Sequence, residues 1–300
     1  MIQLPEGYRE KVLDVLLESR KNFDGSDAQY AKQYGINGSV FSRLKNDESP
    51  DGLLRDAKFL EIGQRLGVNI NARKWVTVET AVYKAIHESM VFCQQHSKSF
   101  MLVDDAGIGK TYTAKHLAHS LKNVFYIDGS QAKAKIEFIR LLARTIGIED
   151  SGKVSHIKAQ IKYLLKVLPR PLVIIDEAGD LDDKTFLEIK ELWNATEGLC
   201  GWYMMGADGL QNKIERNINN KKPGFTEIFS RFGERYNKLV PADKSAKQDF
   251  YRQLITDVIR ANMTDQSKLG EVVKKCLTND SGKISGLRRA ESLVLIHDAA

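Results

Sequence analysis

The segment Ser99–Thr111, SFMLVDDAGIGKT, constrains this chain more than any other. A short apolar run precedes a turn that ends in Gly-Lys-Thr, which is typical of a phosphate-binding loop between a buried strand and a helix. Its glycines let backbone N–H groups converge on an anion, Lys110 would contact the β- and γ-phosphates, and the Thr111 hydroxyl would bind Mg²⁺. We therefore predict a nucleotide site made by Ala106, Gly107, Ile108, Gly109, Lys110, Thr111 and Tyr112.

One position departs from the usual pattern G-x-x-x-x-G-K-[ST], because Asp104 stands where the first glycine is expected. A carboxylate there would repel phosphate if it pointed into the loop, and it would be harmless on the outer side of the strand. The alternative for the whole segment is a glycine turn that binds no ligand, so the rest of the chain has to decide.

The second informative segment is LVIIDEAGDL, about 65 residues after the loop. Its four apolar residues predict a fully buried parallel strand that ends in Asp176 and Glu177. Asp176 would orient Mg²⁺ through water, and Glu177 would activate the water that attacks the γ-phosphate. An Asp-Glu pair can also be a simple helix cap, but the two motifs in this order predict a nucleoside triphosphatase.

The order of apolar runs predicts an α/β fold with a parallel sheet. We expect five strands, interleaved with helices, at 99–103, 123–128, 172–176, 201–206 and 236–240. Only helices are expected before residue 70 and after residue 243, and the basic stretch 211–225 is expected to be a loop. We therefore predict an all-α domain at 1–70, a nucleotide-binding core at 71–240 and a small helical lid at 241–300.

Residues 28–45 have the pattern of a helix–turn–helix, with a turn at Gly35. The pattern resembles the repressor-like domains of phage regulators, in which the second helix enters the major groove. Ala31, Ile36, Val40 and Leu44 are the predicted core positions. The predicted outward positions are Asn37, Ser39, Phe41, Ser42, Arg43 and Lys45. The alternative is a helical module for protein contacts, and the near-neutral charge of residues 1–70 argues against strong DNA affinity of this domain by itself.

Charge and composition limit the partners that the chain can have. The formal charge is +6, and residues 211–300 hold 17 Lys and Arg against 11 Asp and Glu, which is compatible with a polyanion partner. No apolar run approaches the roughly 20 residues that span a bilayer, and no signal peptide pattern is present. Cys93, Cys200 and Cys276 lack metal-ligand spacing. We expect a cytoplasmic, nucleoid-associated protein without a membrane partner.

Residues 75–300 resemble the AAA+ ATPases in the loop DDAGIGKT, the strand LVIIDEA, the later Ser-Arg-Phe and the closing helices. The resemblance implies ATP as the nucleotide and Arg231 as an arginine finger for a neighbouring subunit, with Arg235 as the alternative. It implies that Arg288 is a second sensor in the lid, with Arg289 as the alternative. Asp208 is the candidate for the first sensor.

The order of the three parts resembles the family of phage Mu transposition protein B and its transposon-encoded relatives. The resemblance implies an ATPase that oligomerises on double-stranded DNA as a ring or filament, selects target DNA and activates a transposase. Two alternatives remain: a helicase loader or replication initiator, and a nucleotide-switched transcription regulator that reads an operator.

A ring or filament on DNA needs cations on its inner face, and their contacts would be to phosphates. The candidates besides Arg43 and Lys45 are Lys133, Lys135, Arg144, Lys153 and Lys158, and in the predicted basic loop Lys213, Arg216, Lys221 and Lys222. The alternative for each of them is an ordinary solvated surface.

Overall fold

The computed structural model describes residues 4–23, 25–46, 49, 52–69, 75–277 and 284–298. It forms two compact units, one made of residues 1–74 with 119–123 and the other of residues 75–118 with 124–300. The predicted boundary at residues 70 and 71 lies outside the described residues, and the helices after residue 240 belong to the second unit.

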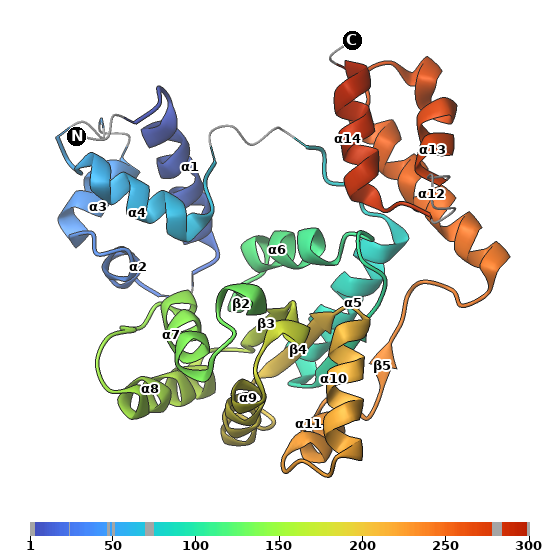
Figure 1. Cartoon of the computed structure of the whole chain (residues 1–300). Helices are drawn as coiled ribbons and strands as arrows, with labels where there is room; N and C mark the ends of the chain where they lie inside the picture. The colour runs from blue at the N-terminus through green and yellow to red at the C-terminus, as the bar shows by residue number, and fades with distance from the viewer. Residues whose placement is uncertain are drawn as a thin grey trace. The chain divides into compact units, whose positions relative to one another are not determined.

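Within its described residues, the first unit contains the helices α1 (Tyr8–Lys21), α2 (Asp27–Gln33), α3 (Gly38–Lys45) and α4 (Asp56–Leu66) (Figure 1). A reciprocal capping box starts α2, in which the Ser26 hydroxyl accepts from the N–H of Gln29 and the Gln29 side chain accepts from the N–H of Ser26. Gly35 has a φ of 61° in the turn between α2 and α3, where a residue with a side chain would be strained.

The core of the first unit corrects one sequence prediction. Phe41 was expected to face outward, yet it is completely buried with Tyr30 and Phe59. It lies three residues before Leu44, so the two side chains share one face of α3, and the outward-facing interpretation was wrong. The other five predicted outward positions are exposed: Asn37, Ser39, Ser42, Arg43 and Lys45.

The second unit contains a five-stranded sheet in the order β2-β3-β4-β1-β5, with every pair parallel. The strands are β1 (Ser99–Val103), β2 (Val124–Asp128), β3 (Leu172–Asp176), β4 (Gly201–Gly206) and β5 (Tyr236–Asn237). The α/β prediction is confirmed. Every residue of β3 and β4 is buried, which explains their continuous apolar sequences. β5 is shorter than the predicted strand 236–240.

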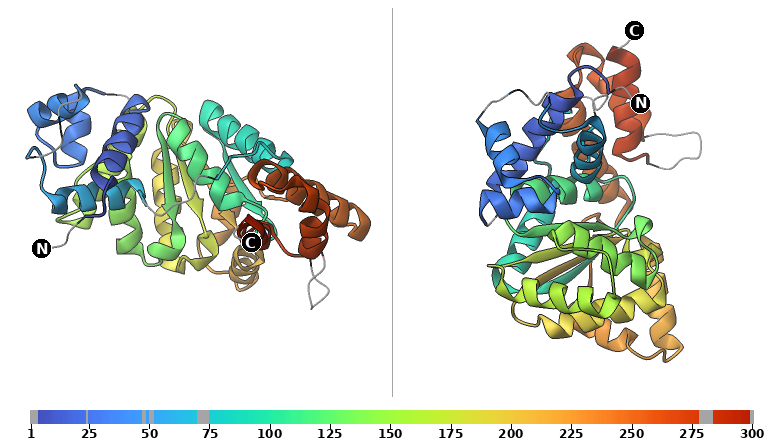
Figure 2. Two further views of the ribbon diagram at one scale, coloured as in Figure 1. Left: turned by 90° about the horizontal axis from the view of Figure 1, so that it is seen from above. Right: turned by 90° about the vertical axis from the view of Figure 1, so that its left-hand side faces the viewer.

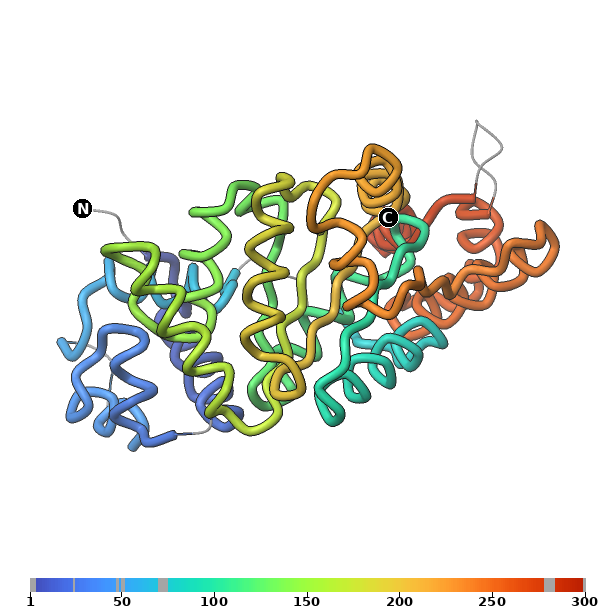
Figure 3. The backbone as a smooth tube through the Cα atoms, turned by 90° about the horizontal axis from the view of Figure 1, so that it is seen from below, coloured from blue at the N-terminus to red at the C-terminus, as the bar shows by residue number. Residues whose placement is uncertain are grey.

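Helices cover both sides of the sheet (Figures 2 and 3). They are α5 (Ala81–His96), α6 (Lys110–Ser120), α7 (Lys135–Ile146), α8 (Val154–Val167), α9 (Asp183–Ala195), α10 (Asp208–Asn219) and α11 (Phe225–Arg231). The predicted basic loop at 211–225 is therefore wrong, because most of it is helix α10. Leu210, Ile214 and Asn217 are buried at helical spacing, while the exposed charges of Glu215 and Arg216 between them hide that pattern.

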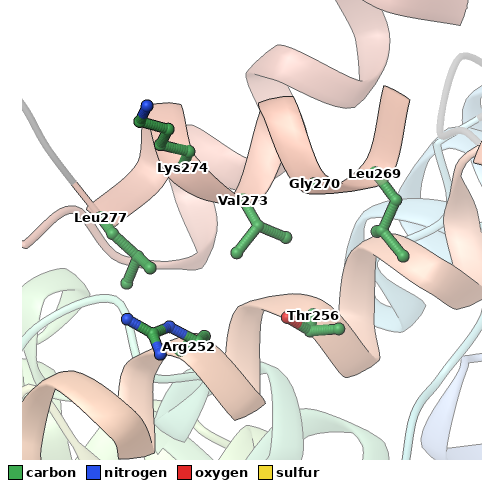
Figure 4. A pocket seen from close by; sticks show the side chains of 7 residues that line it. All are labelled: Arg252, Thr256, Leu269, Gly270, Val273, Lys274 and Leu277. Atoms are coloured by element: carbon green, nitrogen blue, oxygen red, sulfur yellow. The ribbon is translucent and has the colours of Figure 1, made fainter. Parts of the chain in front are cut away.

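Three helices close the second unit: α12 (Lys244–Asn262), α13 (Leu269–Leu277) and α14 (Leu287–Asp298). A groove of about 500 Å³ lies between α12 and α13, and Figure 4 shows its lining: Arg252, Thr256, Leu269, Gly270, Val273, Lys274 and Leu277. In the part of the chain that the structure describes, every helix is too short or too polar to cross a membrane.

Candidate nucleotide-binding site

The predicted phosphate loop lies between the end of β1 and the start of α6 at Lys110. Gly107 has a φ of 76° and Gly109 a φ of 102°, and both values lie in the region that glycine adopts without strain. The N–H of Thr113 donates to the carbonyl of Gly109 at 3.0 Å, so α6 begins directly at the loop. The free N–H groups of that first helical turn are the usual donors to a bound phosphate.

Lys110 is nearly buried, with 9% of its surface exposed. Its ammonium group donates to the carbonyl oxygens of Asp104 at 2.8 Å and of Asp105 at 2.7 Å. Burial lowers the pKa of Lys110, against the opposing effect of nearby carboxylates, of which Asp104 is the first. The loop thus holds a cation among its own carbonyl groups, beside the carboxylates that follow β3.

Asp176 and Glu177 follow one another at the end of β3. Asp176 is buried, and its Oδ2 accepts a hydrogen bond from the Tyr126 hydroxyl at 3.0 Å. Glu177 has a φ of 47°, a left-handed conformation that is costly for a residue with a side chain. Desolvation and the neighbouring Asp176 carboxylate raise the pKa of Glu177, which makes it a stronger base than an ordinary glutamate.

The oxygen donors near the loop suit Mg²⁺. Among the described residues no cluster of three or more His, Cys, Asp or Glu could hold a resident metal ion. Mg²⁺ usually keeps several waters and takes one or two carboxylates together with substrate phosphates. The buried Asp176 carboxylate and the Thr111 hydroxyl match that smaller protein contribution.

The structure decides between the two sequence interpretations of Asp104, which is only 4% exposed. Its Oδ2 accepts from the backbone N–H groups of Leu239 and Val240, and its Oδ1 accepts from the N–H of Asp105 at 2.8 Å. The carboxylate is therefore directed to the segment after β5 and does not occupy the loop. The same bonds explain the early end of β5, because these N–H groups are used before they could extend the ladder.

Three lid residues contact the loop, and sequence analysis missed two of them. The Asp105 carboxylate accepts from the ammonium of Lys247 at 2.6 Å and from the hydroxyl of Tyr251 at 2.9 Å, both on α12. The N–H of Leu287 donates to the carbonyl of Gly107 at 2.8 Å. Residues 247 and 251 belong to no motif, so only the tertiary structure could find them.

The backbone of Gly286 also packs closely against the loop at Gly107. A Cβ atom at this position would lie 2.7 Å from the carbonyl oxygen of Gly107, so only glycine fits without movement. Arg288, the predicted second sensor, follows in the first turn of α14 and is exposed. Arg289 is instead engaged by α13, since its Nε donates to the carbonyl of Lys275 at 3.3 Å.

The predicted arginine finger, Arg231, is the last residue of α11. Its Nε donates to Oδ1 of Asn194 at 2.6 Å, and its guanidinium group lies 5.3 Å from the centroid of the Trp193 ring. Arg231 is therefore held by α9 in its own subunit. Arg235 is exposed, and Asp208, the candidate first sensor, is exposed at the start of α10.

Tyr112 lies next to Thr111 and is 44% exposed. Its hydroxyl hydrogen-bonds with the Thr77 hydroxyl at 2.6 Å, and its ring stacks on His116 with an interplanar angle of 8°. Tyr112 and His116 thus form an aromatic pair on α6, next to the phosphate loop in the chain.

Several cations that were predicted to contact DNA are engaged within the protein. Lys135 and Lys158 both pair with the buried Glu188. Lys158 is only 15% exposed and pairs with Glu191 as well, so the solvated-surface interpretation is wrong and little of the side chain is accessible to DNA. Other candidates also pair, but remain more accessible: Lys133 with Asp180, Arg144 with Asp150, Lys222 with Asp183 and Lys45 with Asp27.

The remaining candidates differ in accessibility. Lys213 donates to the carbonyl groups of Gly179 and Leu181, which joins α10 to the segment after Glu177. Lys153, Arg216, Lys221 and Arg43 are exposed. These exposed cations keep their predicted role.

Residues 93–214 match the family model of the AAA domain, a range that contains the phosphate loop and the Asp-Glu strand end. The central part of this chain is thus similar to the AAA domain family. The chain is 23% identical over 230 residues to the Mu-like prophage FluMu DNA transposition protein B of Haemophilus influenzae, covering 75% of this chain and 77% of that protein.

Two further relatives are the ATP-dependent target DNA activators B of Escherichia phages Mu and D108. Each is 27% identical to this chain over 180 residues, and the matches cover 58% of this chain and 56% of each activator. The Aeropyrum pernix ORC1 protein, solved in complex with DNA, has a TM-score of 0.53 and 13% identity over 75% of this chain and 61% of that chain. At this identity the likeness concerns the fold alone.

Replacing Asp104 by the glycine of the usual pattern is expected to destabilise the protein. Asp104→Gly removes the acceptor for three N–H groups and should lower the free energy of unfolding by about 2 kcal/mol, since hydrogen bonds to a charged group contribute roughly 1.5–3 kcal/mol each and water replaces part of the loss. Denaturant unfolding measures this, with the exposed Asp208→Ala as control. An Asp104→Gly variant as stable as the control would contradict the anchoring role.

Proposed function

We propose that this protein is an ATPase that binds DNA when ATP is bound, assembles on it, selects target DNA and activates a transposase. The observation that carries the proposal is the phosphate loop with Lys110 beside the strand end Asp176-Glu177, in a chain similar to target DNA activators. The proposal places the protein in the cytoplasm of a bacterium, in association with DNA.

The residues of the site divide the chemistry among them. The loop N–H groups and Lys110 bind the phosphates, and Tyr112 offers its ring to the base. Asp176, which Tyr126 orients, and Thr111 would hold Mg²⁺, which neutralises phosphate charge when bound. Glu177 accepts the proton of the attacking water, for which its raised pKa is suitable.

Two arginines complete the site when subunits assemble. Arg231 leaves Asn194 and contacts the γ-phosphate bound by the neighbouring subunit, where it stabilises the charge of the transition state. Arg288, at the lid helix that contacts Gly107, contacts the nucleotide of its own subunit. Hydrolysis therefore depends on the ring or filament.

DNA binding uses phosphate contacts, which require accessible cations and show little sequence preference. Lys153, Arg216 and Lys221 supply them on the second unit, and Arg43 and Lys45 supply them from α3 of the first unit. The exposed polar face of α3 makes the first unit a DNA-binding module in this proposal.

The proposal predicts DNA binding that depends on nucleotide. Purified protein should bind duplexes of unrelated sequence more tightly with a slowly hydrolysed ATP analogue than with ADP or without nucleotide, and affinity should fall steeply with salt. Electrophoretic mobility shifts at several salt concentrations measure this, and Lys110→Ala, which lacks the phosphate contact, should lose the nucleotide effect.

Three outcomes would point elsewhere. Equal binding in all nucleotide states contradicts the proposal. Footprinting that shows one palindromic site indicates a transcription regulator. Capture of a replicative helicase in preference to a transposase indicates a helicase loader.

Glu177→Gln should separate nucleotide binding from hydrolysis. The variant should bind ATP as the wild type does and lose roughly 10²–10⁴-fold in hydrolysis rate, the usual contribution of a general base. It should also remain on DNA, since the ATP state persists.

In the wild type, Glu177 must be deprotonated to act as the base, so the hydrolysis rate should fall as pH decreases through a pKa above the ordinary glutamate value. A pH profile of the wild type without this acidic limb would exclude Glu177 as the base.

Arg231→Ala should bind nucleotide and lose most hydrolysis, by about 10³-fold, because an arginine finger contributes that order of rate. Mixing Arg231→Ala with Lys110→Ala should restore part of the activity, since one variant keeps an intact site and the other supplies the finger. Steady-state hydrolysis of the mixture measures this. Arg235→Ala is the matched control, and Asn194→Ala tests the effect of freeing Arg231. A mixture without restored activity contradicts donation to a neighbour.

A further inference from the structure

The phosphate loop of this protein carries a second carboxylate, Asp105, next to Asp104 in the chain. The backbone carbonyl of Asp105 accepts from the Lys110 ammonium, so this residue belongs to the wall of the loop. Its side chain contacts α12 of the lid, through Lys247 at 2.6 Å and Tyr251 at 2.9 Å. The side chains of Asp105 and Lys247 are about one third exposed, at 35% and 36%.

The charge of Asp105 opposes nucleotide binding. Burial alone would raise the pKa of Asp105, but the hydrogen bonds from Lys247 and Tyr251, with the charge of Lys247, hold it below its ordinary value. The carboxylate is therefore ionised at neutral pH. A triphosphate brings several negative charges to the same loop, and like charges repel strongly where water is partly excluded.

Lys110 does not remove this conflict by itself. Its ammonium is shared by two loop carbonyls and lies among the carboxylates of Asp104, Asp176 and Glu177 as well as Asp105. Asp104 uses its carboxylate on backbone N–H groups, which leaves Asp105 as the loop carboxylate whose partner is a side-chain cation.

We propose that Lys247 is a positioning residue of the nucleotide site, which neutralises Asp105 from the lid and so allows an acidic phosphate loop to bind ATP. This inference rests on the proposed nucleotide-binding function. Tyr251 supports the pair by donating to the same carboxylate oxygen, one helical turn after Lys247. The lid thereby contributes to phosphate affinity through α12, independently of Arg288 on α14.

If Lys247 compensates the charge of Asp105, removing either charge should change the nucleotide affinity in opposite directions. A merely structural contact would make both single variants bind more weakly. Lys247→Met leaves Asp105 unneutralised and should weaken binding of a slowly hydrolysed ATP analogue by roughly five- to tenfold, in keeping with a partly exposed pair. Asp105→Asn should bind the analogue as tightly as the wild type or more tightly, because the negative charge is gone and Lys247 remains. The double variant should return to within about twofold of the wild type. Isothermal titration calorimetry of the full chain measures all four proteins.

The matched control is Lys244→Met, which removes the same charge from the same helix at an exposed position and should leave the affinity unchanged. Thermal unfolding checks that the variants are folded. Weakening by Asp105→Asn as large as that by Lys247→Met, or no rescue in the double variant, overturns the inference in favour of a structural contact. A wild-type protein that binds no nucleotide contradicts the proposed function itself, so the two failures are distinguishable.

Discussion

The hydrogen bonds of the Asp104 carboxylate hold together the parts of this protein that matter for nucleotide binding. They join the end of β1, the strand next to the edge strand β5, to the segment that follows β5 and leads to the lid. A glycine could not make this connection, because it has no acceptor. The departure from the usual loop pattern is therefore a structural anchor, and it connects the phosphate loop to the start of α12.

The loop is contacted by the lid at two further points, Asp105 from α12 and Gly107 from α14. The lid and the loop consequently form one packed assembly, and a change in the lid alters the charge and the position of the loop. Hydrogen bonds and one ion pair connect the lid to the loop.

A buried carboxylate connects helices α7, α8 and α9 of the second unit. Glu188 of α9 is only 5% exposed and receives Lys135 from α7 and Lys158 from α8. A buried carboxylate is costly unless cations and hydrogen bonds compensate it, so these lysines serve the packing of three helices. Helix α10 shows the reverse case, in which the exposed Glu215 and Arg216 lie beside the buried Leu210 and Ile214. A count of basic residues along the sequence could not distinguish lysines that pair with a buried carboxylate from charges that are exposed on a helix.

The sequence by itself determined the strands, the phosphate loop and the Asp176-Glu177 strand end, because each depends on residues that are neighbours in the chain. It misplaced Phe41, since the face that a short helix buries is set by what packs against it. Only the tertiary structure decided the direction of the Asp104 carboxylate, the pairing of Asp105 with Lys247 and the anchoring of Arg231 on α9. These contacts join residues far apart in sequence, and no local periodicity or spacing encodes which distant side chain compensates a charge.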